Sequence, residues 1–280
     1  MQRTEHIIEG TFAYRFEGPN PDHALLVIHG MGGHGGIYDE FCGHHASRGV
    51  DVWSVDLPGH GRSAMASRQG RWTVDEWVEA CAKVAAHIYD RTGLPVFAKG
   101  SSLGVMPAYG VVGASEHVAG AILMGYAVPG TDAALQSPWR TPDGRRILAE
   151  VGETARFDIR RFLDLDEDYG YKGALEQKET DPLNSWYFDL ASYATLYTYD
   201  PVVAPADNTS PILFTVGEND PIAAPAIVRA VAALVGGPVE VYEHSGGVHQ
   251  LMMFHTREYS PIVAEWCRRQ LAAVADQKAE

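Results

Sequence analysis

Six short apolar runs constrain the fold of this chain more than any other feature. They are HALLVIH (23–29), VDVWSVD (50–56), PVFAKG (95–100), VAGAILMG (118–125), PILFTVG (211–217) and PVEVYEH (238–244). Unbroken apolar runs of this length are typical of parallel strands that are covered on both faces. Helical patterns separate most of them, and this alternation predicts an α/β protein built from right-handed βαβ units.

Two further local patterns indicate how the sheet is flanked. The stretch HIIEGTFAYRFEG (6–18) predicts an antiparallel edge hairpin with its turn near Glu9-Gly10. Residues 73–92 predict an amphipathic helix, because Thr73 and Glu76 form an S/T-x-x-E capping box and Gly93 follows the last apolar position.

The strand–helix alternation stops between about Tyr126 and Asp207. This stretch holds Pro/Gly turns, acidic helical patterns and a cluster of aromatic residues that includes Trp186. A structureless loop of that length is improbable in a compact domain. We therefore expect a helical cap over residues 126–207, inserted into a core that comprises residues 1–125 and 208–280.

Composition excludes several classes of partner. The formal charge of −14 and the absence of a basic stripe argue against nucleic-acid binding and against docking on anionic lipid. No stretch of 18 apolar residues predicts a membrane span, so we expect no integral membrane association, and the N-terminus lacks a secretory h-region. The three widely spaced cysteines, Cys42, Cys81 and Cys267, indicate buried, reduced thiols and a cytoplasmic location.

A glycine-rich loop after the first apolar run permits two interpretations. Gly30, Gly32 and Gly35 spell G-x-G-x-x-G, and Asp56 follows at the distance of a ribose-binding acid, which together suit a dinucleotide site. The preceding His29 gives His29-Gly30-Met31-Gly32, which resembles the HGxG-type loop of α/β-hydrolases that donates a backbone N–H to an oxyanion.

A second motif favours the oxyanion interpretation. KGSSLGV (99–105) contains Gly100-Ser101-Ser102-Leu103-Gly104, a G-x-S-x-G at the junction of a predicted strand and helix. A nucleophilic serine needs such a sharp turn, with small neighbours that let strand and helix pack closely around it. The N–H groups of Leu103 and Met31 are then the expected oxyanion donors.

A serine nucleophile also needs a base and an acid that orients the base. His249 follows the last predicted strand and is the candidate base. ENDP (218–221) follows the preceding strand and offers Asp220, with Glu218 beside it. An acid after an earlier strand, near Asp132, is the alternative.

Together these motifs resemble the α/β-hydrolase fold serine hydrolases, and among them the monoacylglycerol lipase and lysophospholipase-like esterases. The resemblance spans nearly the whole chain and includes Asp56-Leu57-Pro58-Gly59-His60-Gly61-Arg62-Ser63 and, more weakly, TDPLNSW (180–186). The chain departs from the lipases at Ser101, where they usually carry His, at Val105, where a second Gly is frequent, and at Lys99, which replaces an apolar residue.

The resemblance implies a mostly parallel twisted sheet with helices on both faces, and a Ser102–His249–Asp220 triad that cleaves an ester. The aromatic residues of the insertion and the apolar side chains of Met31 and Leu103 indicate an uncharged, fairly hydrophobic carboxylic ester. Gly30, Gly32, Ser101, Tyr126 and Trp186 are the expected substrate contacts. No cofactor is needed, and the histidines near the glycine loop fit no metal-ligand spacing. Carbon–carbon, lactone, amide or lyase chemistry, a dinucleotide-dependent oxidoreductase and a non-catalytic binding protein remain the alternatives, and the oligomeric state is left open.

Overall fold

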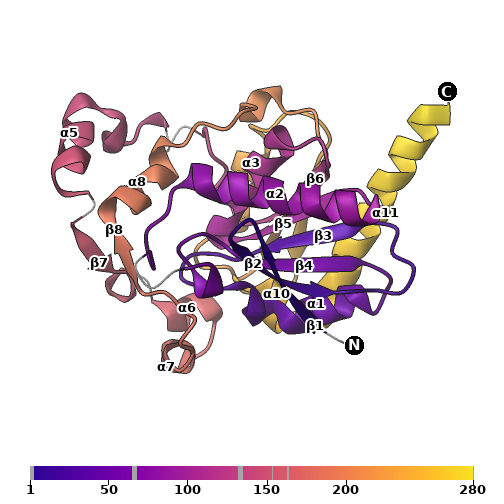
Figure 1. The fold of residues 1–280 in the computed structure, drawn as a ribbon, viewed down its shortest axis with the longest axis horizontal. Helices are drawn as coiled ribbons and strands as arrows, with labels where there is room; N and C mark the ends of the chain where they lie inside the picture. Colours follow the sequence, from indigo (N-terminus) through magenta and orange to yellow (C-terminus); the bar gives the residue numbers. More distant parts are fainter. Residues whose placement is uncertain (1–2, 65–67, 132–134, 153, 163, 280) are drawn as a thin grey trace.

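A mixed sheet forms the centre of the molecule in this computed structural model, which describes residues 3–64, 68–131, 135–152, 154–162 and 164–279 (Figure 1). Within those residues the strand order is β1-β2-β4-β3-β5-β6-β9-β10. The strands are β1 (Arg3–Ile8), β2 (Thr11–Phe16), β3 (Ala24–Ile28), β4 (Asp51–Asp56), β5 (Val96–Ser101), β6 (Val118–Met124), β9 (Ile212–Gly217) and β10 (Val239–His244). All six predicted apolar runs are therefore strands, and those six strands pair in parallel.

The expected N-terminal hairpin is confirmed at one edge of the sheet. β1 pairs with β2 in antiparallel register, and β2 pairs with β4 in the same sense. Glu9 and Gly10 form the turn, with φ of +47° and +88°. Positive φ at both central residues gives the turn a twist that matches the twist of the two strands.

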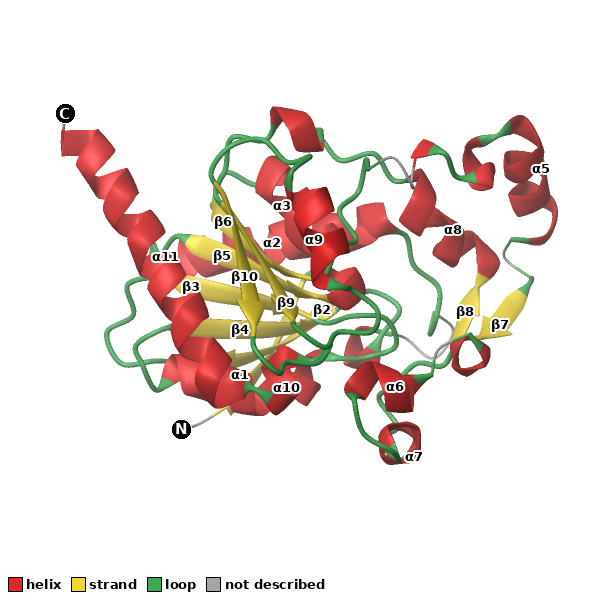
Figure 2. Cartoon of the chain, turned by 180° about the vertical axis from the view of Figure 1, so that it is seen from behind, coloured by secondary structure: helices red, strands yellow, loops and turns green. Residues whose placement is uncertain are grey.

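Helices cover both faces of the sheet, as expected. α2 (Val74–Thr92), α3 (Val105–Ala114) and α9 (Pro225–Ala232) contribute buried residues to the apolar cluster on one face. α1 (Asp39–Ala46), α10 (Leu251–Phe254) and α11 (Thr256–Ala279) contribute to the cluster on the other face. Figures 1 and 2 show the two layers on opposite sides of the strands. None of the described helices combines the length and apolar composition that a membrane crossing requires.

The segment between β6 and β9 lies to one side of the sheet, away from the C-terminal end of α11 (Figure 1). It holds α5 (Pro142–Val151), α6 (Leu165–Tyr169), α7 (Ala174–Glu179), α8 (Leu190–Thr198) and an antiparallel pair, β7 (Arg156–Asp158) with β8 (Tyr187–Asp189). The sequence did not predict this pair, because strands of three residues are too short to show an alternating pattern. Short 3₁₀ turns complete the described structure: η1 (Gly35–Tyr38), η2 (Gly61–Ser63), η3 (Ser102–Gly104), η4 (Pro138–Arg140), η5 (Ile159–Arg161) and η6 (Pro205–Asp207).

The parallel register brings the candidate residues to one edge of the sheet. Ile28 pairs with Gly100, and Ser101 pairs with Met124, so the loops that follow β3, β5 and β6 leave the sheet together. β10 ends at His244, beside Gly217 at the end of β9. Sites on open α/β sheets gather at the carboxyl ends of the strands.

Candidate active site

Ser102 occupies a strained turn between β5 and α3. Its φ is +53°, a left-handed conformation that non-glycine residues adopt rarely and that is typical of functional turns. The flanking glycines are sterically required. A Cβ on Gly100 would lie 2.4 Å from the Gly104 carbonyl oxygen, and a Cβ on Gly104 would lie 2.5 Å from the His29 carbonyl oxygen. This is the geometry that a nucleophile elbow needs.

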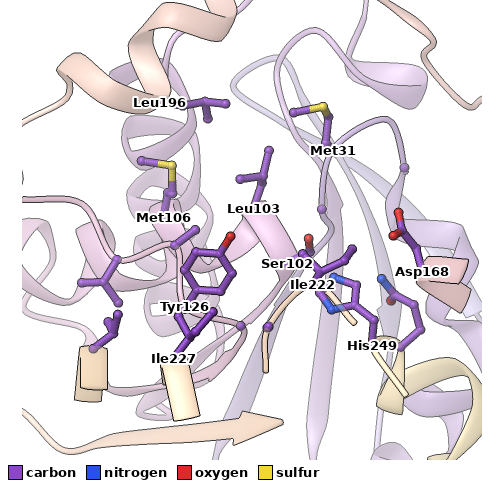
Figure 3. A pocket seen from close by; sticks show the side chains of 18 of the residues that line it. Met31, Ser102, Leu103, Met106, Tyr126, Asp168, Leu196, Ile222, Ile227 and His249 are labelled. Carbon is purple, nitrogen blue, oxygen red and sulfur yellow. The ribbon is translucent and has the colours of Figure 1, made fainter. Parts of the chain in front are cut away.

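An acid–imidazole pair lies next to Ser102. Nδ1 of His249 is 2.8 Å from Oδ2 of Asp220, and both side chains are almost completely buried. The other carboxylate oxygen of Asp220 accepts hydrogen bonds from the N–H groups of Ile222 and Ala223. Asp220 therefore accepts through both oxygens and orients Nδ1–H toward itself. Nε2 of His249 is buried and has no hydrogen-bond partner among the described residues, and Figure 3 shows the ring beside Ser102.

The glycine loop lies against the serine. A Cβ on Gly30 would lie 3.0 Å from Cβ of Ser102. His29 is fully buried, and its Nε2 accepts a hydrogen bond from Leu57 N–H at 3.0 Å. Nδ1 therefore carries the proton and donates to the Gly30 carbonyl oxygen at 2.7 Å. His29 thus braces the loop. The N–H groups of Met31 and Leu103 donate to no described group.

A cavity of about 580 Å³ opens above these residues. Its wall includes Ser102, His249, Met31 and Leu103, so the structure brings the expected nucleophile, base and oxyanion donors to one space. Apolar side chains form most of the wall, and in Figure 3 Met106, Leu196 and Ile227 lie on one side of Ser102. An apolar cavity with a few convergent polar groups is typical of a small-molecule site.

Two of the five expected substrate contacts line the cavity and three do not. Gly30 and Tyr126 belong to its wall. Gly32 faces the 180–186 segment instead. Trp186 is partly buried against apolar side chains of the core and of α6, and the Arg160 guanidinium lies over its ring. Ser101 is fully buried and its hydroxyl donates to Oε1 of Gln250 at 3.4 Å. Ser101 is the last residue of β5, and its side chain packs within the fold, whereas Ser102 begins the turn that faces the cavity.

Lys99 also lies away from the cavity. Its side chain is fully buried, its amine donates to the Gly100 carbonyl oxygen at 3.2 Å, and it lies over the ring of Tyr259. Burial lowers the pKa of Lys99 well below the ordinary value. The amine is part of the packing behind the turn.

Two ionisable residues of the cavity wall were missed by sequence reasoning. Asp168 on α6 lies on the opposite side of Ser102 from the apolar side chains (Figure 3). Burial raises the pKa of Asp168 to about 6. Lys178 on α7 donates to the Tyr169 hydroxyl, and burial lowers the pKa of Lys178 to about 8. The acidic pattern FLDLDEDYGY contains Asp168 but resembles an ordinary solvated helix, so no sequence signal distinguished this carboxylate.

The dinucleotide interpretation is wrong for Asp56. This side chain is fully buried, and its two oxygens accept hydrogen bonds from the N–H groups of Gly35 and Arg62, each at 2.7 Å. A carboxylate that is buried in this way is not accessible to a ribose. Asp56 instead holds the glycine loop against the loop that follows β4.

Among the described residues, the other candidate acid and the three cysteine thiols occupy environments that do not favour a catalytic role. Glu218 accepts hydrogen bonds from the Ser245 hydroxyl and the Gly246 N–H, and the Gly246 bond holds the pKa of Glu218 below its ordinary value. Asp132 lies outside the described residues. Cys42, Cys81 and Cys267 are all buried, and burial raises each thiol pKa, which disfavours a reactive thiolate.

Comparison with known families agrees with this geometry. The model of the hydrolase family described as serine aminopeptidase, S33, matches residues 19–254. The chain belongs to this family. The expected α/β-hydrolase fold is likewise confirmed.

Individual relatives of the hydrolase include lipases and esterases. A monoglyceride lipase homolog of monkeypox virus is 33% identical over 88 residues, which are 30% of this chain and 30% of that protein. The crystal structure of Paleococcus ferrophilus monoacylglycerol lipase has a TM-score of 0.70 at 19% identity, covering 96% of this chain and all of that one. A thermostable carboxyl esterase from Bacillus coagulans has a TM-score of 0.79 at 17% identity, covering 95% and 97% of the two chains. At these identities the structural likeness establishes the fold.

Proposed function

We propose that this hydrolase cleaves carboxylic esters through a covalent acyl-enzyme on Ser102. The observation that carries the proposal is the strained Ser102 turn at the floor of the cavity, beside a His249 whose Nδ1 is held by Asp220. An ordinary, unstrained turn could connect β5 to α3 equally well. The strain at Ser102 therefore supports a functional role for this serine. The family match, with its lipase and esterase relatives, supports ester hydrolysis.

In the proposed reaction Ser102 Oγ attacks the ester carbonyl carbon while Nε2 of His249 takes its proton. The N–H groups of Met31 and Leu103 stabilise the tetrahedral oxyanion. The carbonyl re-forms, the C–O bond breaks, and His249 protonates the departing alcohol. Water, deprotonated by His249, then attacks the acyl-enzyme. The bond between the acyl carbon and Ser102 Oγ breaks, His249 returns the proton to Oγ, and the acid is released. Asp220 holds the imidazole orientation and stabilises the imidazolium throughout.

The cavity wall supports a substrate with two unlike halves. The apolar side chains around Met106, Leu196 and Ile227 suit a hydrocarbon acyl chain. Asp168, on the other side of Ser102, is nine-tenths buried, and its carboxylate has no side-chain hydrogen-bond partner among the described residues. A hydroxyl-bearing alcohol would supply the missing donor. The proposed substrate is therefore an uncharged ester of an apolar acid and a small polar alcohol, and monoacylglycerols are of this kind.

We further propose that residues 126–207 form a cap over the cavity. Leu165, Tyr169, Tyr193, Leu196 and Tyr197 from this segment line the same space as Ser102 and His249. A cap of this kind excludes water and positions the substrate, and its opening can limit turnover.

Labelling with a fluorophosphonate probe, read by intact-mass spectrometry, tests the proposal. Wild type is expected to gain one probe mass, Ser102→Ala to gain none, and His249→Ala to react far more slowly. Ser101→Ala is the matched control, because it removes the neighbouring hydroxyl, which lies outside the cavity, and should leave labelling intact. Folded wild type that stays unlabelled would overturn the triad. A panel of glycerol esters of graded acyl length, with an aminoacyl amide for comparison, then tests the substrate.

A further inference from the structure

The motif TDPLNSW (180–186) meets the glycine loop at a point that the proposed mechanism does not use. The N–H of Ser185 donates to the carbonyl oxygen of Gly32 at 2.8 Å, and Ser185 is fully buried. Gly32 has φ of +74°, and a Cβ there would lie 2.8 Å from the Ser185 carbonyl oxygen. The two backbones therefore pack with no room for a side chain between them.

A second contact joins the same two segments. Nε2 of His34 is 2.8 Å from Oδ2 of Asp181. Nδ1 of His34 accepts a hydrogen bond from Gly36 N–H at 3.2 Å, so Nε2 carries the hydrogen and donates it to Asp181. The other oxygen of Asp181 accepts a hydrogen bond from Leu183 N–H at 2.9 Å. Asp181 thus fixes its own turn and the glycine loop together.

The turn between these anchors carries Met31. Gly33 N–H donates to the Gly30 carbonyl oxygen at 3.3 Å, which closes a four-residue turn around Met31 and Gly32. His29 holds the same Gly30 oxygen from the core side. Because a trans peptide is planar, fixing the Gly30 carbonyl also fixes the direction of the Met31 N–H. The far half of the turn is held by Ser185 and, through His34, by Asp181.

We propose that Asp181 and Ser185 are positioning residues for the oxyanion donor, so that Met31 N–H is correctly aimed only when the 180–186 segment is seated on the glycine loop. This inference rests on the proposed ester hydrolysis. It assigns to the cap a part in transition-state stabilisation, in addition to enclosing the substrate. Misplacing a donor by about 1 Å can cost roughly 10²-fold in rate.

Asp181→Ala, which removes the acceptor from His34, is the test variant. Removing one oxyanion donor typically lowers kcat by about 10²–10³-fold, so a misaimed donor is expected to lower it by roughly 10–100-fold. KM should change little, because the ground-state carbonyl depends less on the donor. Affinity for an alkyl boronic acid, which forms a tetrahedral adduct on the serine, should fall in parallel with kcat. Asp181→Asn keeps an acceptor oxygen at the same place and should restore most of both.

Glu176→Ala is the matched control, since it removes an exposed carboxylate from neighbouring α7 that contacts no part of the loop. Thermal unfolding of each variant checks that the fold is retained. The inference is overturned if Asp181→Ala turns over ester like wild type, or if it raises KM with kcat unchanged. Failure of the proposed function is distinguishable, because wild type and Glu176→Ala would then also show no labelling and no ester turnover.

Discussion

At the scale of single residues, two residues of the proposed site occupy positions that lower the stability of the fold. Ser102 occupies a strained φ, and Asp168 keeps a buried carboxylate in the cavity wall, where burial raises its pKa to about 6. Each feature opposes folding stability and suits the proposed chemistry. Residues that break local rules in this way are the ones most expected to be functional.

Replacing Asp168 by Asn should stabilise the protein in a pH-dependent way. The folded-state pKa of about 6 lies above the ordinary value of 3.8, so the folded protein binds this proton more tightly than the unfolded chain does. The carboxylate therefore costs nothing well below pH 3.8, costs progressively more as the pH rises from about 4 to 6, and costs a constant amount above that. Asp168→Asn should exceed wild type by about 1–3 kcal/mol in unfolding free energy at pH 8, and the difference should shrink as the pH falls from 6 and vanish below the ordinary pKa of 3.8.

Urea unfolding at a series of pH values measures this difference. The two stability profiles would run parallel if Asp168 were ordinarily solvated. In the same variant we expect KM for a monoacylglycerol to rise more than KM for a simple alkyl ester, because an amide cannot replace the charged acceptor for the alcohol hydroxyls.

Gly104→Ala should be severely destabilising. Its Cβ would lie 2.5 Å and 2.6 Å from two backbone carbonyl oxygens at the end of β3, and backbone atoms in the core cannot move aside cheaply. We expect a loss of about 3 kcal/mol or more. Gly43→Ala in α1 is the matched control, because nothing lies within 4 Å of its added methyl group, and a helical alanine should gain about 0.5–1 kcal/mol. Equal stability of the two variants, measured by urea unfolding, would contradict the steric argument.

At the scale of elements, α2 depends on its N-terminal cap. The Thr73 hydroxyl accepts a hydrogen bond from Glu76 N–H at 3.1 Å, and Glu76 accepts one from Thr73 N–H at 2.8 Å. Thr73→Ala removes one of these two bonds and should lower the unfolding free energy by about 1 kcal/mol, with ester turnover unchanged. The shift of the urea midpoint measures the effect. An unshifted midpoint would mean that packing of the buried face of α2 alone holds the helix end.

Elements whose signal is local could be predicted from the sequence. The capping box of α2, the hairpin turn at Glu9-Gly10 and the six apolar strands each carry their pattern within a few residues. The pair β7–β8 could not be predicted, because its strands are three residues long and are separated by almost thirty residues. The same limit applied to the site. Motifs indicated Ser102, Asp220 and His249, whereas the placement of Asp168 in the cavity wall depends on how α6 packs.

At the scale of the whole molecule, long-range ion pairs and hydrogen bonds join the segment 126–207 to the core. Asp189, whose side chain is 3% exposed, pairs with Arg71 from the core and with Arg156 from β7. The Ser185–Gly32 and Asp181–His34 contacts join the same segment to the glycine loop. Segments far apart in sequence therefore meet through polar groups, which makes the position of the segment 126–207 on the core specific.

The net charge of −14 should oppose approach to anionic surfaces. We expect hydrolysis of one ester to be slower in mixed micelles that contain an anionic detergent than in neutral micelles at about 10 mM salt, where the Debye length is roughly 30 Å. Raising the salt to about 150 mM shortens that length to roughly 8 Å and should bring the two rates together. The neutral micelles serve as the control, because their rate should barely depend on salt. A rate on anionic micelles that falls with salt would contradict this expectation. It would mean that a local cationic surface, such as the exposed Arg145 and Arg146 of α5, outweighs the net charge where substrate enters.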